Sequence, residues 1–266
     1  MSADSDALRE RVKSVWLLSF GDMTTLLITF FVMMLALNYG AISRVQKWLD
    51  DELTHTYAEL KRAVREERLT LVSVMRDSRG VVLRIRTDGA FASGSATPST
   101  ELLRQVTALG RTFRYLRLFN EQATPTGRAV LALAERQHRR FQPEISVEGH
   151  TDSDPIAPWS PLRNNWILSA RRAQRVLGQL LYASAMDPRW FSVAGYGASR
   201  PLVPNDTPSH KAMNRRVEIV ITAGFVTVED AKGAEKPVMP TEKQVAPPAA
   251  TAASGKNGGD PVPSDH

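Results

Sequence analysis

The chain has 266 residues and a formal net charge of +6, and it contains no cysteine. This length exceeds one typical domain, and the absence of cysteine excludes disulfides, thiol chemistry and cysteine-based metal sites. The basic residues are scattered and often lie beside acidic ones. The chain carries no RNA-binding or helix-turn-helix signature, so we expect no nucleic-acid partner.

One segment near the N-terminus is apolar enough to cross a membrane. A polar tail at residues 1–14 precedes residues 15–39, which begin VWLLSFGDMTTLLITFFVMMLALN. A spanning helix needs about 20 apolar residues, whereas the apolar core of a cleavable signal has about 7–15. We therefore predict an uncleaved, single-pass membrane helix at residues 15–39.

Basic residues on the two sides of this helix bear on its orientation. Arg9, Arg11 and Lys13 precede the helix, while Arg44 and Lys47 follow it and weaken the asymmetry. Because basic residues concentrate on the cytoplasmic side of membrane proteins, we predict a cytoplasmic N-terminus and export of the remainder.

Asp22 is the only ionisable residue from Val15 to Asn38. It lies roughly 10 Å below Val15 at the rise of an α-helix. An aspartate near the bilayer centre costs about 2.5–3.5 kcal/mol on insertion scales, and such residues commonly serve proton or ion transport. The alternative is a shallow aspartate that reaches water among the lipid headgroups.

Three threonines follow Asp22 along the same helix. Hydroxyl groups within a membrane can bond to their own backbone, to a neighbouring helix or to a transported ion. The first role is the commonest for any single threonine, so these are weaker candidates for an ion path or a partner contact. They are Thr24, Thr25 and Thr29.

Residues 40–68 are predicted to form a helical linker. Apolar side chains recur every three or four residues along it, which indicates one apolar face. Such a face is typical of a two-stranded coiled coil or of packing on a partner, and the alternative is a solvated helical spacer. The apolar positions are Ile42, Val45, Leu49, Leu53, Tyr57, Leu60 and Val64.

Residues 69–225 have the pattern of a globular domain. Strands that alternate with helices predict an α+β fold, an α/β sandwich with helices on one face of a mixed sheet. Residues 226–266 are rich in proline and poor in large apolar side chains, so we expect a disordered tail. The expected strands are 69–75, 80–86, 144–148, 190–195 and 216–222, and the expected helices are 98–120, 125–140 and 165–184.

Two polar segments of this domain could form one binding site. ISVEGHTDSDP ends a strand at Asp152, and NNWILSARRA opens a helix that carries Arg172. Asp152 could bind a ligand ammonium while Arg172 forks a ligand carboxylate. Two alternatives remain at this point, namely a salt bridge between Asp152 and Arg172 and a turn-capping role for Asp152. The spacing of His150, Asp152 and Asp154 is weak evidence for a metal, and we predict no metal site.

A third segment, MNRRVEIVI, follows a long loop that is rich in glycine and proline. Asn214 and Arg215 lie at the start of the final predicted strand. Val217, Ile219 and Ile221 alternate along that strand, as core residues do.

GHTD, LSARRA, GYGASRP and NRRVEI, in this order, resemble the OmpA-like peptidoglycan-binding domain, and WLLSFGDMTTLLITFFVM resembles the membrane helix of MotB-type stator proteins. The resemblance implies a stator subunit of a bacterial ion-driven motor, most simply a flagellar one. It would be an inner-membrane protein with a periplasmic domain, acting as a homodimer inside a ring of MotA-like subunits. Asp22 would carry the transported H⁺ or Na⁺.

The same resemblance implies a site for the diaminopimelate of the cell-wall peptide. Asp152 and Arg172 match the pair that binds it, and Asn165 and Leu168 lie on the matching ligand-facing stretch. The candidate peptidoglycan-binding residues are Asp152, Arg172, Asn165, Leu168, Thr151, Asn214 and Arg215.

The chain also departs from the usual family pattern. Val15 stands where members usually have proline before the tryptophan, residues 99–122 resemble an insertion, and the linker is short. A relative such as the ZorB-type motor subunit of an antiphage system is one alternative. A passive, membrane-tethered wall anchor is another. We find no catalytic residues, so we expect no enzyme and no cofactor beyond the transported ion.

Overall fold

The computed structural model describes residues 3–120, 122, 124–157 and 159–227. It confirms the predicted class, a mixed α/β domain that follows one N-terminal apolar helix. The last strand runs through Thr227, two residues beyond the predicted end of the domain. The rest of the predicted tail lies outside the described residues.

Helix α1 runs without a break from Ala3 to Glu66. Within it, Val15–Leu35 is long and apolar enough to cross a membrane, with a mean hydropathy of 1.7, and none of it is buried against the rest of the chain. Apolar side chains that face outward on all sides are characteristic of a helix whose surroundings are lipid or another protein. The helix α1 therefore includes both the predicted membrane segment and the predicted linker.

Five strands form one mixed sheet in the order β1-β2-β5-β3-β4. Only the pair of β3 and β4 is parallel, and its crossover runs through a helix, as a parallel connection requires. The predicted β1–β2 hairpin is confirmed, and Asp77 pairs with Gly80 at its turn. The strands are β1 (Val72–Asp77), β2 (Gly80–Arg86), β3 (Arg139–His150), β4 (Phe191–Gly195) and β5 (Arg216–Thr227).

Each of the four helices after α1 begins at a side-chain cap. Ser99, Thr124, Asn164 and Thr207 each accept a hydrogen bond from a backbone N–H of the first turn, which satisfies a donor that has no partner within the helix. The helices are α2 (Thr100–Phe113), α3 (Pro125–Arg136), α4 (Asn165–Ser184) and α5 (Pro208–Asn214), with short 3₁₀ turns η1 (Arg117–Phe119) and η3 (Pro188–Trp190).

Two predicted helices are shorter in the structure. The helix predicted at residues 98–120 ends at Phe113, and the chain then turns so that Leu116 and Leu118 enter the core. The helix predicted at 125–140 ends at Arg136, because the chain from Arg139 onward pairs with β5. Pairing with a long partner strand outweighs the local helical pattern there.

Helices α2 and α4 pack on one face of the sheet, and alternate strand residues point toward them. Leu102, Val106 and Leu109 of α2 belong to this core, so the segment that resembles an insertion is part of the domain's interior. The strand residues of the core are Val72, Val81, Leu83, Ile85, Ile145, Val147, Phe191, Val217, Ile219 and Ile221.

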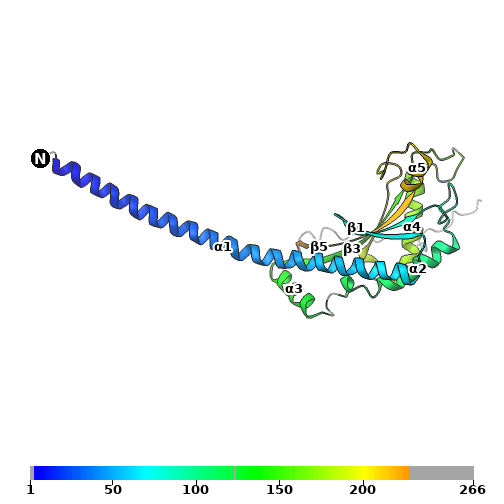
Figure 1. Cartoon of the computed structure of the whole chain (residues 1–266), viewed down its shortest axis with the longest axis horizontal. Coiled ribbons are helices and arrows are strands. Elements are labelled where there is room, and N and C mark those ends of the chain that lie inside the picture. The colour runs from blue at the N-terminus through cyan, green and yellow to red at the C-terminus, as the bar shows by residue number, and fades with distance from the viewer. Residues whose placement is uncertain (1–2, 121, 123, 158, 228–266) are drawn as a thin grey trace, which may run out of the picture. The chain divides into compact units, whose positions relative to one another are not determined.

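The C-terminal part of α1 packs on its own domain, which corrects both interpretations of the linker. Figure 1 shows it running along the sheet past β1 and β5. Leu49 and Leu60 are buried, and Trp48 stacks edge-on against Phe141 of β3. The apolar face was predicted correctly, but a pattern in one helix does not identify the surface that covers it.

A buried ion pair adds to this docking. Glu52 of α1 is 1% exposed and accepts hydrogen bonds from Nε and Nη2 of Arg117, the shorter of them 2.6 Å. Arg76 of β1 also binds Asp50 and Thr54 of α1. Because Glu52 is almost fully buried, Arg117 supplies the hydrogen bonds that its carboxylate needs, and the two segments are held together.

Candidate functional site

The candidate site lies where β3 and β4 end and α4 begins. Two glycines allow α4 to sit directly on the strands, since a Cβ at Gly149 or Gly195 would collide with the backbone of Ser169 or Ala170. Gly197 has a φ of +51°, which favours glycine. Its N–H donates to Ser169 Oγ at 2.9 Å, and its carbonyl accepts from the N–H of Thr151 at 2.9 Å. This bonding fixes the start of α4 against both strand ends.

Asp152 is held in place by its own backbone turn. Its Oδ1 accepts a hydrogen bond from the N–H of Asp154 at 3.2 Å, the turn-capping geometry that was one sequence interpretation. Asn165 supports the loop, because its Nδ2 donates to the carbonyls of Asp152 and Asp154 at 3.3 and 2.8 Å. Thr151 is buried, and its hydroxyl has no hydrogen-bond partner among the described residues.

Arg172 lies in the site as a buried cation. It is 4% exposed, and its Nε and Nη2 donate to the carbonyls of Ser95 and Ala92 at 2.8 and 3.3 Å. Its guanidinium also lies over the Phe91 ring, 5.2 Å from the centroid. Among the described residues no carboxylate forms an ion pair with it, so the predicted alternative of a salt bridge to Asp152 is wrong.

The pKa of Arg172 reflects this environment. Burial, together with the nearby positive charge of Arg215, lowers the pKa of Arg172 to about 10. At neutral pH the guanidinium is still charged. A buried cation without a carboxylate partner is costly for the folded protein, and a ligand carboxylate would relieve that cost.

The partner of Asp152 is Arg215, at the junction of α5 and β5. Its Nη1 donates to Asp152 Oδ2 at 2.8 Å, and its Nε and Nη2 donate to Asp88 at 3.1–3.3 Å. Asp88 was not among the predicted site residues. The Asp-Gly pair at 88–89 was a visible turn signal, but nothing local in the sequence placed that turn beside Arg215.

Two other predicted residues lie beneath the site. Asn214 is fully buried, and its amide bonds the backbone of Leu202 and Val203 and the side chain of Asn205. This bonding holds the loop before α5. Leu168 is also buried, one turn before Arg172 on α4. Their predicted contact with peptidoglycan stays a prediction.

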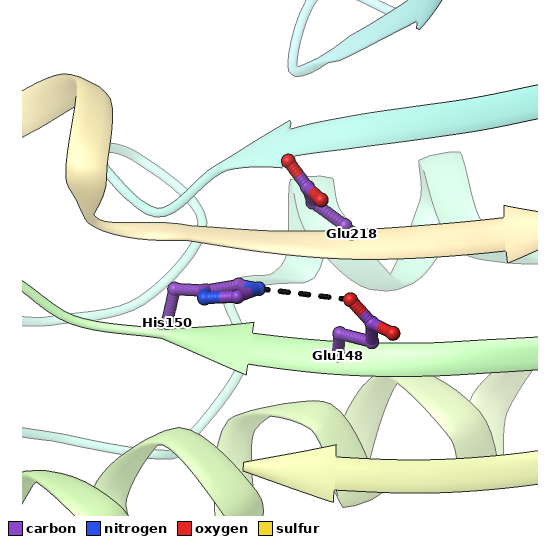
Figure 2. A group of neighbouring side chains, drawn as sticks. All are labelled: Glu148, His150 and Glu218. Atoms are coloured by element: carbon purple, nitrogen blue, oxygen red, sulfur yellow. Dashed lines mark ion pairs between the residues drawn. The ribbon is translucent and has the colours of Figure 1, made fainter. Parts of the chain in front are cut away.

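A separate ionic cluster occupies the face of the sheet opposite α4. Glu148, His150 and Glu218 bring ligand atoms within 4.8 Å of one another, a spacing that a metal ion could use. Figure 2 shows Glu148 and His150 on β3 opposite Glu218 on β5, with His150 Nε2 lying 3.9 Å from Glu148.

Arginines already neutralise the carboxylates of this cluster. Glu218 accepts hydrogen bonds from Arg79, Arg84 and Arg216 at 2.9–3.1 Å, and Arg79 also reaches Glu148. Burial alone would raise the pKa of Glu218, but hydrogen bonds and charges of the three arginines lower it to about 2. A divalent cation would meet three positive side chains here, so the donor set favours a structural role.

The membrane segment presents its polar groups differently. Asp22 is exposed, and no described residue bonds or pairs with it. The hydroxyl of Thr25 donates to the carbonyl of Gly21 at 2.6 Å, and that of Thr29 donates to Thr25 and Leu26 at 3.0 and 2.9 Å. Thr24 bonds the Phe20 carbonyl in the same way. Within this chain the threonines thus serve their own backbone.

Two family comparisons match this organisation. The OmpA family matches residues 119–215, a range that includes Asp152, Arg172 and Arg215. The fold and the site therefore define an OmpA-like domain. The family described as "Membrane MotB of proton-channel complex MotA/MotB" matches residues 5–48, a range that includes Asp22. The chain thus combines a segment similar to the MotB membrane region with an OmpA-like domain.

Individual relatives agree with this assignment. Uncharacterized protein YtxE of Bacillus subtilis is 25% identical over 80% of this chain and 90% of its own length. Motility protein B of the same organism is 26% identical over 64% of this chain, and the match spans only 56% of that protein. The crystal structure of a MotB-like protein from Desulfovibrio vulgaris shares the fold, with a TM-score of 0.52 and 24% identity over 66% of this chain and 98% of that one.

Proposed function

We propose that the chain is a stator subunit that anchors an ion-driven membrane motor to peptidoglycan through the site around Arg172. The observation that carries the anchoring half is the buried guanidinium of Arg172, which has no carboxylate partner among the described residues. Charge-assisted hydrogen bonds to a carboxylate are worth about 1.5–3 kcal/mol each. A ligand carboxylate is therefore the group that this site lacks.

The ligand that fits best carries an ammonium next to that carboxylate. Asp152 lies in the same site, fixed by the turn to Asp154 and by Asn165. The free end of diaminopimelate in a cell-wall peptide offers both groups on one carbon. Asp152 would take the ammonium and Arg172 the carboxylate, with Thr151 and Leu168 bordering them.

The membrane half of the proposal rests on Asp22. It is the only carboxylate within Val15–Leu35, and it is exposed, with no partner in the described part of the chain. A lone aspartate in such a helix needs a protein or aqueous environment that other chains supply. We propose that two copies of α1 lie inside a ring of MotA-like subunits and that Asp22 carries H⁺ or Na⁺ between them.

The proposed arrangement implies one membrane topology. The N-terminus would lie in the cytoplasm, α1 would cross the inner membrane once, and the domain would lie in the periplasm. One charge moving through the membrane potential yields about 2.3 kcal/mol per 100 mV. A domain fixed to the wall would allow that energy to act on a rotor, the flagellar one in the simplest case.

The anchoring proposal is tested by substituting the two neighbouring arginines of α4. Arg172→Ala should weaken sedimentation of the full-length protein with purified peptidoglycan by about tenfold or more, the equivalent of one lost charged contact. Arg171→Ala is the matched control, because Arg171 is exposed and its one side-chain hydrogen bond to a described residue goes to Gln174. Unchanged binding by a folded Arg172→Ala protein would refute the role of Arg172.

A further inference from the structure

Arg215 contacts two carboxylates at once. Its Nη1 lies 2.8 Å from Asp152 Oδ2, and its Nη2 lies 3.1 and 3.2 Å from the two oxygens of Asp88. Arg172 contacts no carboxylate among the described residues. The four charges sum to zero, but their pairing is unequal: one cation holds both anions, and the other holds carbonyl oxygens only.

Asp152 does not need Arg215 for its position. The backbone N–H of Asp154 and the side chain of Asn165 hold the Asp152 turn. The backbone of Arg215 is likewise fixed, because its carbonyl accepts from the N–H and the hydroxyl of Thr87 at 3.2 and 3.0 Å. Only the side chain of Arg215 is left to move, and it is 31% exposed.

Asp88 is a second ion-pair partner for Arg215. Its side chain is 58% exposed, whereas that of Asp152 is 10% exposed. Asp88 accepts from both Nε and Nη2, so the pair persists if the bond from Nη1 to Asp152 is lost. A ligand ammonium could then take the position of Nη1 on a carboxylate that stays where it is.

We propose that Arg215 is an exchangeable counter-ion of Asp152, displaced by the ammonium of the bound cell-wall peptide and retained by Asp88. This inference rests on the proposed function. On binding, the ligand ammonium then replaces Arg215 as the partner of Asp152, and the ligand carboxylate pairs with Arg172. A ligand with a carboxylate but no ammonium pairs with Arg172 and leaves Arg215 bound to Asp152. Asp88 therefore influences the affinity only of ligands that carry the ammonium.

The test measures two peptides against the full-length protein in detergent by calorimetry. One is a tripeptide ending in diaminopimelate, and the other ends in 2-aminopimelate, which keeps both carboxylates and lacks the free amine. In Asp88→Asn, Arg215 has only Asp152 as a carboxylate partner. We expect the Kd of the amine-bearing peptide to rise roughly three- to fivefold relative to the Kd of the peptide without the amine. This factor corresponds to the free energy of one exposed ion pair.

The variant Arg215→Gln, alone and combined with Asp88→Asn, completes a double-mutant cycle. It should bind the amine-bearing peptide at least as tightly as wild type, and adding Asp88→Asn to it should not change the ratio. Asp187→Asn is the matched control, because Asp187 pairs with Arg189 just before the first residue of β4, at the end of that strand away from the site.

Other outcomes would overturn the exchange. Equal weakening of both peptides by Asp88→Asn would make Asp88 a support for its loop. Loss of the amine-bearing peptide in Arg215→Gln would make Arg215 a direct ligand contact. A wild-type protein that binds neither peptide would refute the proposed function itself, whereas normal wild-type binding with an unchanged ratio in Asp88→Asn would refute only the exchange.

Discussion

The membrane segment of α1 and the strand-end site each contain one charged side chain that forms no ion pair with any described residue, but their surroundings are opposite. Asp22 is exposed on an apolar helix, and the nearby threonines bond their own backbone. Arg172 is buried in a cradle made of two carbonyls and the Phe91 ring. The proposed ligand site is therefore built within one chain, whereas under our proposal other chains would supply the surroundings of Asp22.

Asp22→Asn tests the membrane side of this comparison and should have the largest effect. Asparagine keeps the shape of the side chain but cannot hold a transported proton or balance a cation. We expect ion flux with a MotA-like partner to fall to background, while assembly and wall binding persist. Flux is measured in vesicles under defined H⁺ and Na⁺ gradients, which also identifies the ion.

Asp51→Asn is the matched control for Asp22, because it removes an exposed aspartate from the docked part of the same helix. It should leave flux unchanged. Flux that survives in Asp22→Asn would refute the role of Asp22 as the ion carrier. Absence of flux in the wild-type protein with its partner would instead favour the passive anchor.

A second prediction contrasts Arg172 with Glu218, a buried charge whose counter-ions are all present. The pKa of Glu218 is about 2 in the folded protein, against 4.5 for an ordinary glutamate. The folded state thus binds this proton less readily than the unfolded state. The resulting stability, on the order of 3 kcal/mol, is complete above pH 4.5 and is lost as the pH falls toward 2.

Glu218→Gln should therefore flatten the dependence of stability on pH in that window. Urea unfolding of both proteins at pH 6 and pH 3 measures the difference, with the exposed Glu66→Gln as control. An equal loss of stability in wild type and Glu218→Gln between these pH values would contradict the strong pairing of Glu218 with its arginines.

Local signals in the sequence were sufficient for the elements and for the face that each buries. Helix α4 runs from Asn165 to Ser184 as predicted, because Asn164 caps it and its apolar positions keep helical spacing. Strand β2 also matches its predicted limits, Gly80–Arg86, since a turn fixes its start. The motif positions of Asp152 and Arg172 also predicted that the two lie near each other, and the charge of Asp152 does act on Arg172; their joint binding of a ligand stays a prediction.

Partners distant in the sequence could not be predicted from those signals. Asp152 pairs with Arg215, which is 63 positions away, and not with Arg172. That choice depends on how α5 and β5 meet the strand ends, which no local pattern encodes. Periodicity within residues 40–68 revealed their apolar face, because it is a property of one helix. It could not reveal which surface covers that face, because docking also depends on the second surface.

The last prediction concerns that docking and has the smallest expected effect. Arg117→Ala would leave the carboxylate of Glu52 buried without its partner, which costs about 3–5 kcal/mol for a fully buried pair. Because the side chain of Arg117 is 37% exposed, water can enter and we expect about 2 kcal/mol. Arg104→Ala breaks an exposed pair with Glu101, which solvent screens, and should cost clearly less than Arg117→Ala. Chemical unfolding of the full-length protein measures both, and equal losses would mean that the C-terminal part of α1 is not part of the domain's cooperative structure.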